Sequence, residues 1–64
     1  MDNNIYRVIR KKNMTQADLA VMVGVKREYI NRIINRKVTP TVPLGMRIAY
    51  ALDVPMEDLF ILEQ

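Results

Sequence analysis

The 64-residue chain contains no histidine and no cysteine, which removes the side chains most often used as nucleophiles, proton carriers and metal ligands. It also has no glycine-rich phosphate loop, and its few carboxylates stand where they can cap helices or solvate the surface. We therefore expect a binding protein, with no enzymatic activity, no cofactor, no metal and no small-molecule ligand. The side chains available for recognition form a dense polar cluster: Lys26, Arg27, Glu28, Asn31 and Arg32.

Basic residues are concentrated in the first three quarters of the chain. Positions 1–47 hold all ten lysines and arginines and three acidic residues, whereas positions 48–64 hold four acidic residues and no basic one. A basic body attracts a polyanion such as a nucleic acid, and the acidic end would stay away from it. An uneven scatter of ordinary surface charges is the alternative interpretation.

Length and composition predict one small globular domain spanning residues 1–64. A chain of this size buries only about 60% of the surface that its unfolded form exposes, so we expect a thin core. No run approaches the roughly 20 apolar residues that a bilayer span requires. The N-terminus also lacks the basic and then apolar order of a signal peptide. We therefore expect a cytoplasmic protein without a membrane partner.

Residues 14–33 contain two helical patterns separated by Gly24. The first runs over about 15–23 and opens with Thr15, whose hydroxyl can cap free amides, with Asp18 three residues later. Gly24 can adopt the left-handed conformation that ends a helix, which predicts a turn at 24–25 and a second helix over about 26–34. Such a pair is typical of the helix-turn-helix motif, whose second helix enters the DNA major groove. The pattern alone leaves open an ordinary helical hairpin in a small bundle.

Three further helical segments make the predicted fold all-α. The first has Ile5 and Ile9 at helical spacing, and the last is the short segment DVPMEDLF. Between them, a helix begins after Thr41, a plausible cap. Gly45 in that helix marks a close helix crossing or is merely tolerated, at a cost of about 1 kcal/mol relative to alanine. The buried face of the same helix is predicted to contain Val42, Met46, Ile48, Ala49 and Leu52.

The order of residues closely resembles the Cro/C1-type (XRE) family of transcriptional regulators. The resemblance covers about residues 5–60 and rests on TQADLA, the GV turn, the spacing of Ile30 and Ile33, and IAYALDVPMEDLF. It implies a five-helix bundle of the lambda-repressor-like DNA-binding type, which binds double-stranded operator DNA, commonly as a homodimer on an inverted repeat. The expected function is a sequence-specific regulator, and specifically a repressor. The alternative is a protein-interaction module, such as an antitoxin or an anti-repressor partner, that uses its C-terminal surface.

The resemblance also implies roles for individual residues. Arginines at base-reading positions suit bidentate contact with guanine, so a half-site containing G·C pairs is expected. Glu28 either accepts from cytosine or positions an arginine through a salt bridge, and Tyr29 either contacts DNA or packs. The implied base-reading residues are Lys26, Arg27, Glu28, Tyr29, Asn31 and Arg32. The implied phosphate-contacting residues are Thr15, Gln16, Asn35, Arg36, Lys37 and, from its charge alone, Arg10.

The chain departs from the family pattern in three ways. Lys26 stands where a serine or threonine usually caps the recognition helix. Either the helix start loses roughly 1 kcal/mol of capping, or Lys26 is there chiefly to reach DNA. The glycine that often follows that helix is absent, so Asn35 or Arg36 must take the left-handed turn or the loop must differ. Ile9 and Ile34 occupy positions where the family often has a buried ion pair, and we predict that they pack against each other.

Useful operator affinity requires two recognition helices about 34 Å apart, which a twofold dimer presents. The chain has more apolar residues near its C-terminus than a small core can hide, and these are the candidate dimer interface. They are Leu44, Met56, Leu59, Ile61 and Leu62. In the alternative arrangement, residues 60–62 pair with the N-terminal segment NNIY as a short strand within one subunit.

Overall fold

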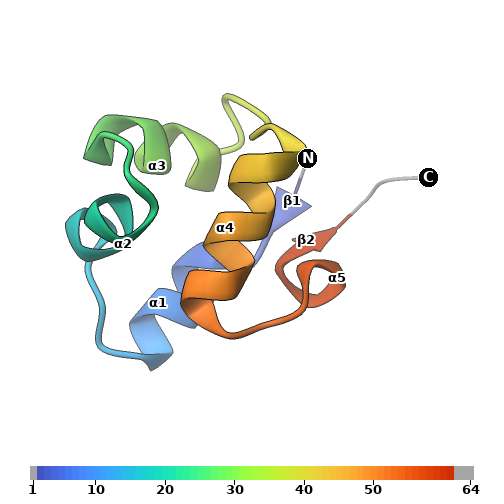
Figure 1. Ribbon diagram of the computed structural model, residues 1–64, viewed down its shortest axis with the longest axis horizontal. Coiled ribbons are helices and arrows are strands. Elements are labelled where there is room, and N and C mark those ends of the chain that lie inside the picture. The colour runs from blue at the N-terminus through green and yellow to red at the C-terminus, as the bar shows by residue number, and fades with distance from the viewer. Residues whose placement is uncertain (1, 62–64) are drawn as a thin grey trace.

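The computed structural model describes residues 2–61, which form five helices and two short strands (Figure 1). No helix within this range is long and apolar enough to cross a membrane. The prediction of a five-helix fold with a terminal strand pair is confirmed. The elements in chain order are β1 (Asp2–Asn3), α1 (Ile5–Lys11), α2 (Gln16–Val23), α3 (Arg27–Ile34), α4 (Val42–Leu52), α5 (Met56–Leu59) and β2 (Phe60–Ile61).

The two strands join the ends of the described chain. They are antiparallel, with Asp2 opposite Ile61 and Asn3 opposite Phe60. The backbone amide of Asn4 extends this pairing by donating to the Leu59 carbonyl at 2.8 Å. Residues 60–61 therefore pair with the N-terminus of the same subunit, as the alternative arrangement predicted, and Leu62 lies outside the described residues.

Every helix contributes buried side chains to one core. The buried apolar residues are Ile5, Ile9, Leu19, Ala20, Val23, Ile30, Ile33, Leu44, Ile48, Ala49, Leu52, Leu59 and Phe60. Ile34 is partly buried and packs against this cluster, to which Ile9 also belongs. A direct contact between Ile9 and Ile34 therefore remains a prediction.

The buried face of α4 differs from the predicted one. Val42 and Met46 are 68% and 56% exposed, so their assignment to the core was wrong. The buried stripe instead follows four-residue spacing through Leu44, Ile48 and Leu52, and it includes Gly45 beside it. Met46 lies two residues from Leu44, about 200° around the helix, and this rotation turns it away from the core.

Gly45 allows α5 and β2 to approach α4 closely. A Cβ atom at this position would lie 3.2 Å from Cε of Met56 and 3.5 Å from Cε2 of Phe60. The first of these distances is shorter than an ordinary van der Waals contact, so the glycine marks a close crossing, one of the two roles predicted for it.

Local hydrogen bonds fix both ends of α2. The Asp18 amide donates to Oγ1 of Thr15 at 3.0 Å, and the Thr15 amide donates to Oδ2 of Asp18 at 3.0 Å, which completes the predicted capping box. At the other end, Gly24 has φ of 78°, and the amides of Gly24 and Val25 both donate to the Ala20 carbonyl. The predicted left-handed stop at Gly24 is therefore confirmed.

The capping box should make the stability of the protein depend on pH. Hydrogen bonds from the backbone amide and the hydroxyl of Thr15 lower the pKa of Asp18 below its ordinary value of 3.8. A carboxyl group whose pKa is lower in the folded state stabilises the protein above its unfolded pKa, and this contribution is lost as the pH falls through the folded value. We expect Asp18→Ala to lower Tm at pH 7, and the difference from wild type to narrow below pH 3.8.

Thermal unfolding followed by circular dichroism across this pH range would measure the difference. Glu57→Ala is the matched control, because Glu57 also lies in the first turn of a helix but its carboxylate accepts no hydrogen bond from residues 2–61. A Tm difference for Asp18→Ala that stays constant from neutral to acidic pH would contradict the role given to the ionised carboxylate.

Candidate nucleic-acid interface

After the turn at Gly24, one face of α3 packs into the protein and the opposite face is exposed. Ile30 and Ile33 are buried on the inner face, where α3 packs against α2. The outer face is polar and exposed, and it surrounds a shallow hollow of about 320 Å³. Four of the six predicted base-reading residues line this hollow: Arg27, Glu28, Asn31 and Arg32.

Within residues 2–61 the charges on this face are not neutralised by ion pairs. Within residues 2–61 the ion pair present is that of Arg36 with Asp2, so neither Arg27 nor Arg32 is held by a carboxylate. Glu28 likewise forms no ion pair in this range, which does not support the interpretation of Glu28 as an arginine-positioning partner. Two guanidinium groups are consequently available to an incoming acceptor, and guanine O6 and N7 have the geometry to accept from each.

The remaining two base-reading candidates lie at the edge of this face. Lys26 precedes the first turn of α3 in an extended conformation, and its side chain makes no capping hydrogen bond. The predicted absence of a cap is therefore confirmed. Tyr29 is partly buried and packs against the core, so much of its ring is committed to packing.

Three amide side chains connect α2 to α3 across the exposed surface. Nδ2 of Asn31 donates to Oε1 of Gln16 at 3.1 Å. Nδ2 of Asn35 donates to the backbone carbonyl of Asn31 at 2.9 Å and to its Oδ1 at 3.2 Å. Gln16, predicted to hold a phosphate, is the first residue of α2, where backbone amides lack helical partners and the helix dipole favours an anion.

The chain after α3 carries the other phosphate-contacting candidates. Asn35, Arg36 and Lys37 are all exposed. Arg36 takes the left-handed conformation, with φ of 62°, and so replaces the missing glycine as predicted. Its Nη1 lies 3.4 Å from Oδ1 of Asp2. Because both side chains are well exposed, this pair contributes little to stability and leaves the arginine free to exchange its partner for a phosphate.

Arg10 lies apart from this surface. Its guanidinium donates to the hydroxyl of Tyr6 at 3.2 Å and sits 5.7 Å from the centre of the Tyr6 ring. Arg10 belongs to the last turn of α1, whose C-terminal end is at the opposite edge of the molecule from α3 in Figure 1. The end of α1 that carries Arg10 therefore lies away from α3.

The candidate dimer interface needs correction. Leu44 and Leu59 are buried in the core of the single subunit, so they are not available to a second copy. Both occupy the inward face of a helix, which the count of apolar residues near the C-terminus did not distinguish from the surface. Met56 is partly buried, and Ile61 is 44% exposed.

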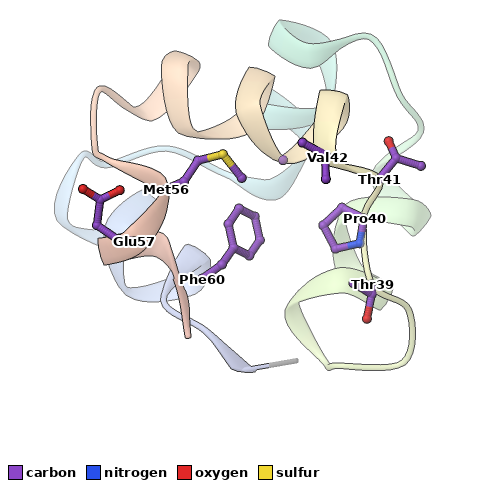
Figure 2. Close-up of a pocket in the computed structure, with 8 residues that line it drawn as sticks. Thr39, Pro40, Thr41, Val42, Met56, Glu57 and Phe60 are labelled. Atoms are coloured by element: carbon purple, nitrogen blue, oxygen red, sulfur yellow. The ribbon is translucent and has the colours of Figure 1, made fainter. Parts of the chain in front are cut away.

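An apolar groove lies where this interface was expected. Figure 2 shows Met56 and Phe60 from the α5 side facing Pro40 and Val42 across the hollow. Its volume is about 480 Å³, and the connection between α3 and α4 forms one wall. Val42 is thus a surface residue of this groove. The sequence prediction missed it because a large aliphatic side chain in a helix was assigned to the core.

Asp2 and Asn3 were also missed by the sequence prediction. Besides the pair of Asp2 with Arg36, Nδ2 of Asn3 donates to the Ile33 carbonyl at 2.9 Å. The N-terminal strand therefore holds the C-terminal end of α3. No local pattern indicated this, because the partners are about thirty residues apart in the chain.

Comparison with known proteins agrees with this geometry. A helix-turn-helix family profile matches residues 5–59. The chain belongs to the XRE-type helix-turn-helix family. This family consists of DNA-binding transcriptional regulators, and the assignment confirms the resemblance drawn from the sequence. Within residues 2–61 of this helix-turn-helix protein, no group of three or more acidic, histidine or cysteine residues is placed to hold a metal ion.

Two archaeal relatives cover most of the helix-turn-helix chain. An uncharacterized HTH-type transcriptional regulator of Archaeoglobus fulgidus is 41% identical over 54 residues, which are 84% of this chain and 76% of the relative. An uncharacterized HTH-type transcriptional regulator of Methanocaldococcus jannaschii is 41% identical over 58 residues, which are 91% of this chain and 85% of the relative.

Replacing Lys26 tests whether this helix-turn-helix protein has a lysine in place of a capping residue because the lysine binds DNA. We expect Lys26→Ser to stabilise the protein by about 1 kcal/mol, because serine caps the free amides of α3. For a domain of this size that corresponds to a rise in Tm of about 4–8 °C. The same change should weaken binding to duplex DNA and, because it removes one positive charge, reduce the salt dependence of the affinity.

Calorimetry and fluorescence anisotropy across a salt series would measure the two effects. Lys37→Ser is the matched control, since it removes an exposed lysine where no helix begins, so DNA affinity should fall without a gain in Tm. Unchanged DNA affinity in Lys26→Ser would refute the role of Lys26 in binding DNA.

Proposed function

We propose that the protein is a sequence-specific transcriptional regulator that binds an inverted-repeat operator through α3 in the major groove. The observation that supports this most is the cluster of Arg27, Glu28, Asn31 and Arg32 around one hollow on the outer face of α3. Within the described residues neither Arg27 nor Arg32 forms an ion pair, so their guanidinium donors are free for base edges. The two arginines favour guanine and Glu28 favours cytosine, which suits a half-site containing G·C pairs.

Phosphate contacts on both sides of this helix would fix its register. Thr15 and Gln16 lie at the start of α2, and Asn35 to Lys37 follow the end of α3. Contacts of this kind position a recognition helix without reading sequence, and they dominate the salt dependence of binding. The base-reading residues would then supply the discrimination.

A homodimer belongs to the same proposal. The groove between the α3–α4 connection and α5 is apolar, and it lies next to the segment that directly follows the recognition helix. A second copy bound there would lie beyond the end of α3, as a twofold arrangement of half-sites requires. In this revised interface Val42 joins Met56 and Ile61, which were already predicted, and the buried Leu44 and Leu59 are removed.

Repression requires fewer binding surfaces on the protein than activation does. A dimer that occupies an operator blocks access to the DNA without further contacts, whereas activation requires a surface for the transcription machinery. We therefore propose a repressor that acts in the cytoplasm, where it meets its DNA, and that has no catalytic activity.

The second candidate is a protein-interaction module that uses the same groove for a different protein. The apolar lining of the groove and the acidic Glu57 at its edge favour this possibility. The two functions differ in a measurable way. An interaction module would bind a protein partner tightly and DNA only weakly, with little difference between sequences and with an affinity that salt abolishes.

The operator proposal can be tested by selecting sites from a random duplex pool at physiological salt. We expect an inverted repeat with half-site centres one helical turn apart. Arg27→Ala should weaken binding to the best site by about 5- to 150-fold, equivalent to about 1–3 kcal/mol, and relax selection at a single G·C pair.

Arg10→Ala is the matched control, because it removes an arginine that the structure places away from α3. It should preserve the selected motif. If the random pool yields no motif and the affinity depends on salt concentration but not on sequence, the protein attracts DNA only electrostatically. That result would reject sequence-specific regulation.

The dimer proposal can be tested with Val42→Glu. This residue is exposed and begins α4, where an acidic side chain favours the helix dipole, so the subunit should fold normally. A charge in an apolar interface should weaken self-association at least about tenfold, which sedimentation equilibrium would measure. Operator affinity should fall in parallel.

Tyr50→Glu is the control for this test, since Tyr50 lies on the same helix, is 90% exposed and does not line the groove. Equal effects of Val42→Glu and Tyr50→Glu on self-association would argue against the groove as the interface. A wild-type protein that stays monomeric at tens of micromolar, with and without its operator, would reject the dimer altogether.

A further inference from the structure

The three linked amides of Asn35, Asn31 and Gln16 have one consistent hydrogen-bond direction. Nδ2 of Asn35 lies 2.9 Å from the backbone carbonyl oxygen of Asn31, which can only accept. The nitrogen of the Asn35 amide must therefore face Asn31. The same nitrogen lies 3.2 Å from Oδ1 of Asn31, so the Asn31 side chain turns its oxygen toward Asn35.

This direction continues from Asn31 to Gln16. With its oxygen facing Asn35, the amide of Asn31 points its nitrogen the opposite way, toward α2. There Nδ2 of Asn31 donates to Oε1 of Gln16 at 3.1 Å. The oxygen of the Gln16 amide is thereby occupied, and within residues 2–61 its Nε2 has no acceptor. A fixed backbone carbonyl on α3 thus determines which end of the Gln16 side chain is free.

The free end is the one that a phosphate needs. Phosphate oxygens only accept hydrogen bonds, so a glutamine contributes to phosphate binding through Nε2 and not through Oε1. Gln16 also begins α2, where free backbone amides and the helix dipole favour an anion. Orienting the side chain in advance reduces the entropy that is lost when the phosphate binds.

We propose that Asn31 is a positioning residue, which holds Gln16 so that its Nε2 donates to a DNA phosphate, rather than a base-reading residue. This inference rests on the proposed binding of DNA through α3. It reassigns one of the residues around the α3 hollow, because both polar atoms of the Asn31 side chain are already used within the protein. Among the residues around the α3 hollow, base reading then falls to Arg27, Glu28 and Arg32.

A double-mutant cycle tests this assignment. The affinities of wild type, Asn31→Ala, Gln16→Ala and the double variant are measured on the selected operator and on an unrelated duplex at one salt concentration. Each single change should weaken binding to both duplexes by about the same factor, roughly fivefold, as expected for loss of one hydrogen bond that carries no sequence information. The double variant should be no weaker than Gln16→Ala.

Two results of the cycle would overturn the proposal. Additive losses in the double variant would show that Asn31 acts independently of Gln16. A loss in Asn31→Ala that is confined to the operator would show that Asn31 reads a base. Thermal unfolding of each variant separates these effects from a change in stability, because a merely structural role would not disappear in the Gln16→Ala background.

The free protein gives a readout that does not depend on an operator. In wild type, the side-chain NH₂ of Gln16 should be rigid on the nanosecond timescale by ¹⁵N relaxation, and Asn31→Ala should make it mobile. Equal mobility in the two proteins would overturn the proposal. If no operator is selected, sequence-specific regulation fails, but this measurement and the cycle on the unrelated duplex still decide the role of Asn31. Absence of binding to any duplex would overturn both.

Discussion

The left-handed turn at Gly24 is the constraint on which the rest of this small protein depends. A Cβ atom there would meet nothing within 4 Å, so the glycine is required by its φ of 78° and not by lack of space. The turn stops α2 and redirects the chain within two residues. It thereby sets the angle at which α3 packs on α2, with Ile30 and Ile33 inward and the arginines outward.

Hydrogen bonds then hold α2 and α3 in this position. The capping box fixes the start of α2, the amides of Asn31 and Gln16 join the two helices, and Asn3 in β1 bonds the end of α3. In a chain with a thin core and no disulfide, these polar contacts supplement limited apolar burial. The position of α3 is consequently fixed by contacts with both β1 and α2.

Local patterns were sufficient to predict the five helices, the Thr15 cap and the Gly24 stop, because each depends on residues within one or two helical turns. They failed where burial depends on packing between distant elements. Gly45 faces the core, while the larger Val42 and Met46 face solvent, so side-chain size misled the assignment. The contacts of Asp2 with Arg36 and of Asn3 with the end of α3, and the burial of Leu44, were equally invisible to local reasoning.

The central claim is that the outer face of α3, together with the start of α2, forms the surface that meets DNA. Titration of ¹⁵N-labelled protein with a duplex tests it most directly, because every described backbone amide except those of prolines reports its own environment. The largest shift changes are predicted at Gln16 and across residues 26–37, with the α5 side changing less. Changes concentrated at the α4–α5 groove, with α3 unaffected, would contradict the claim.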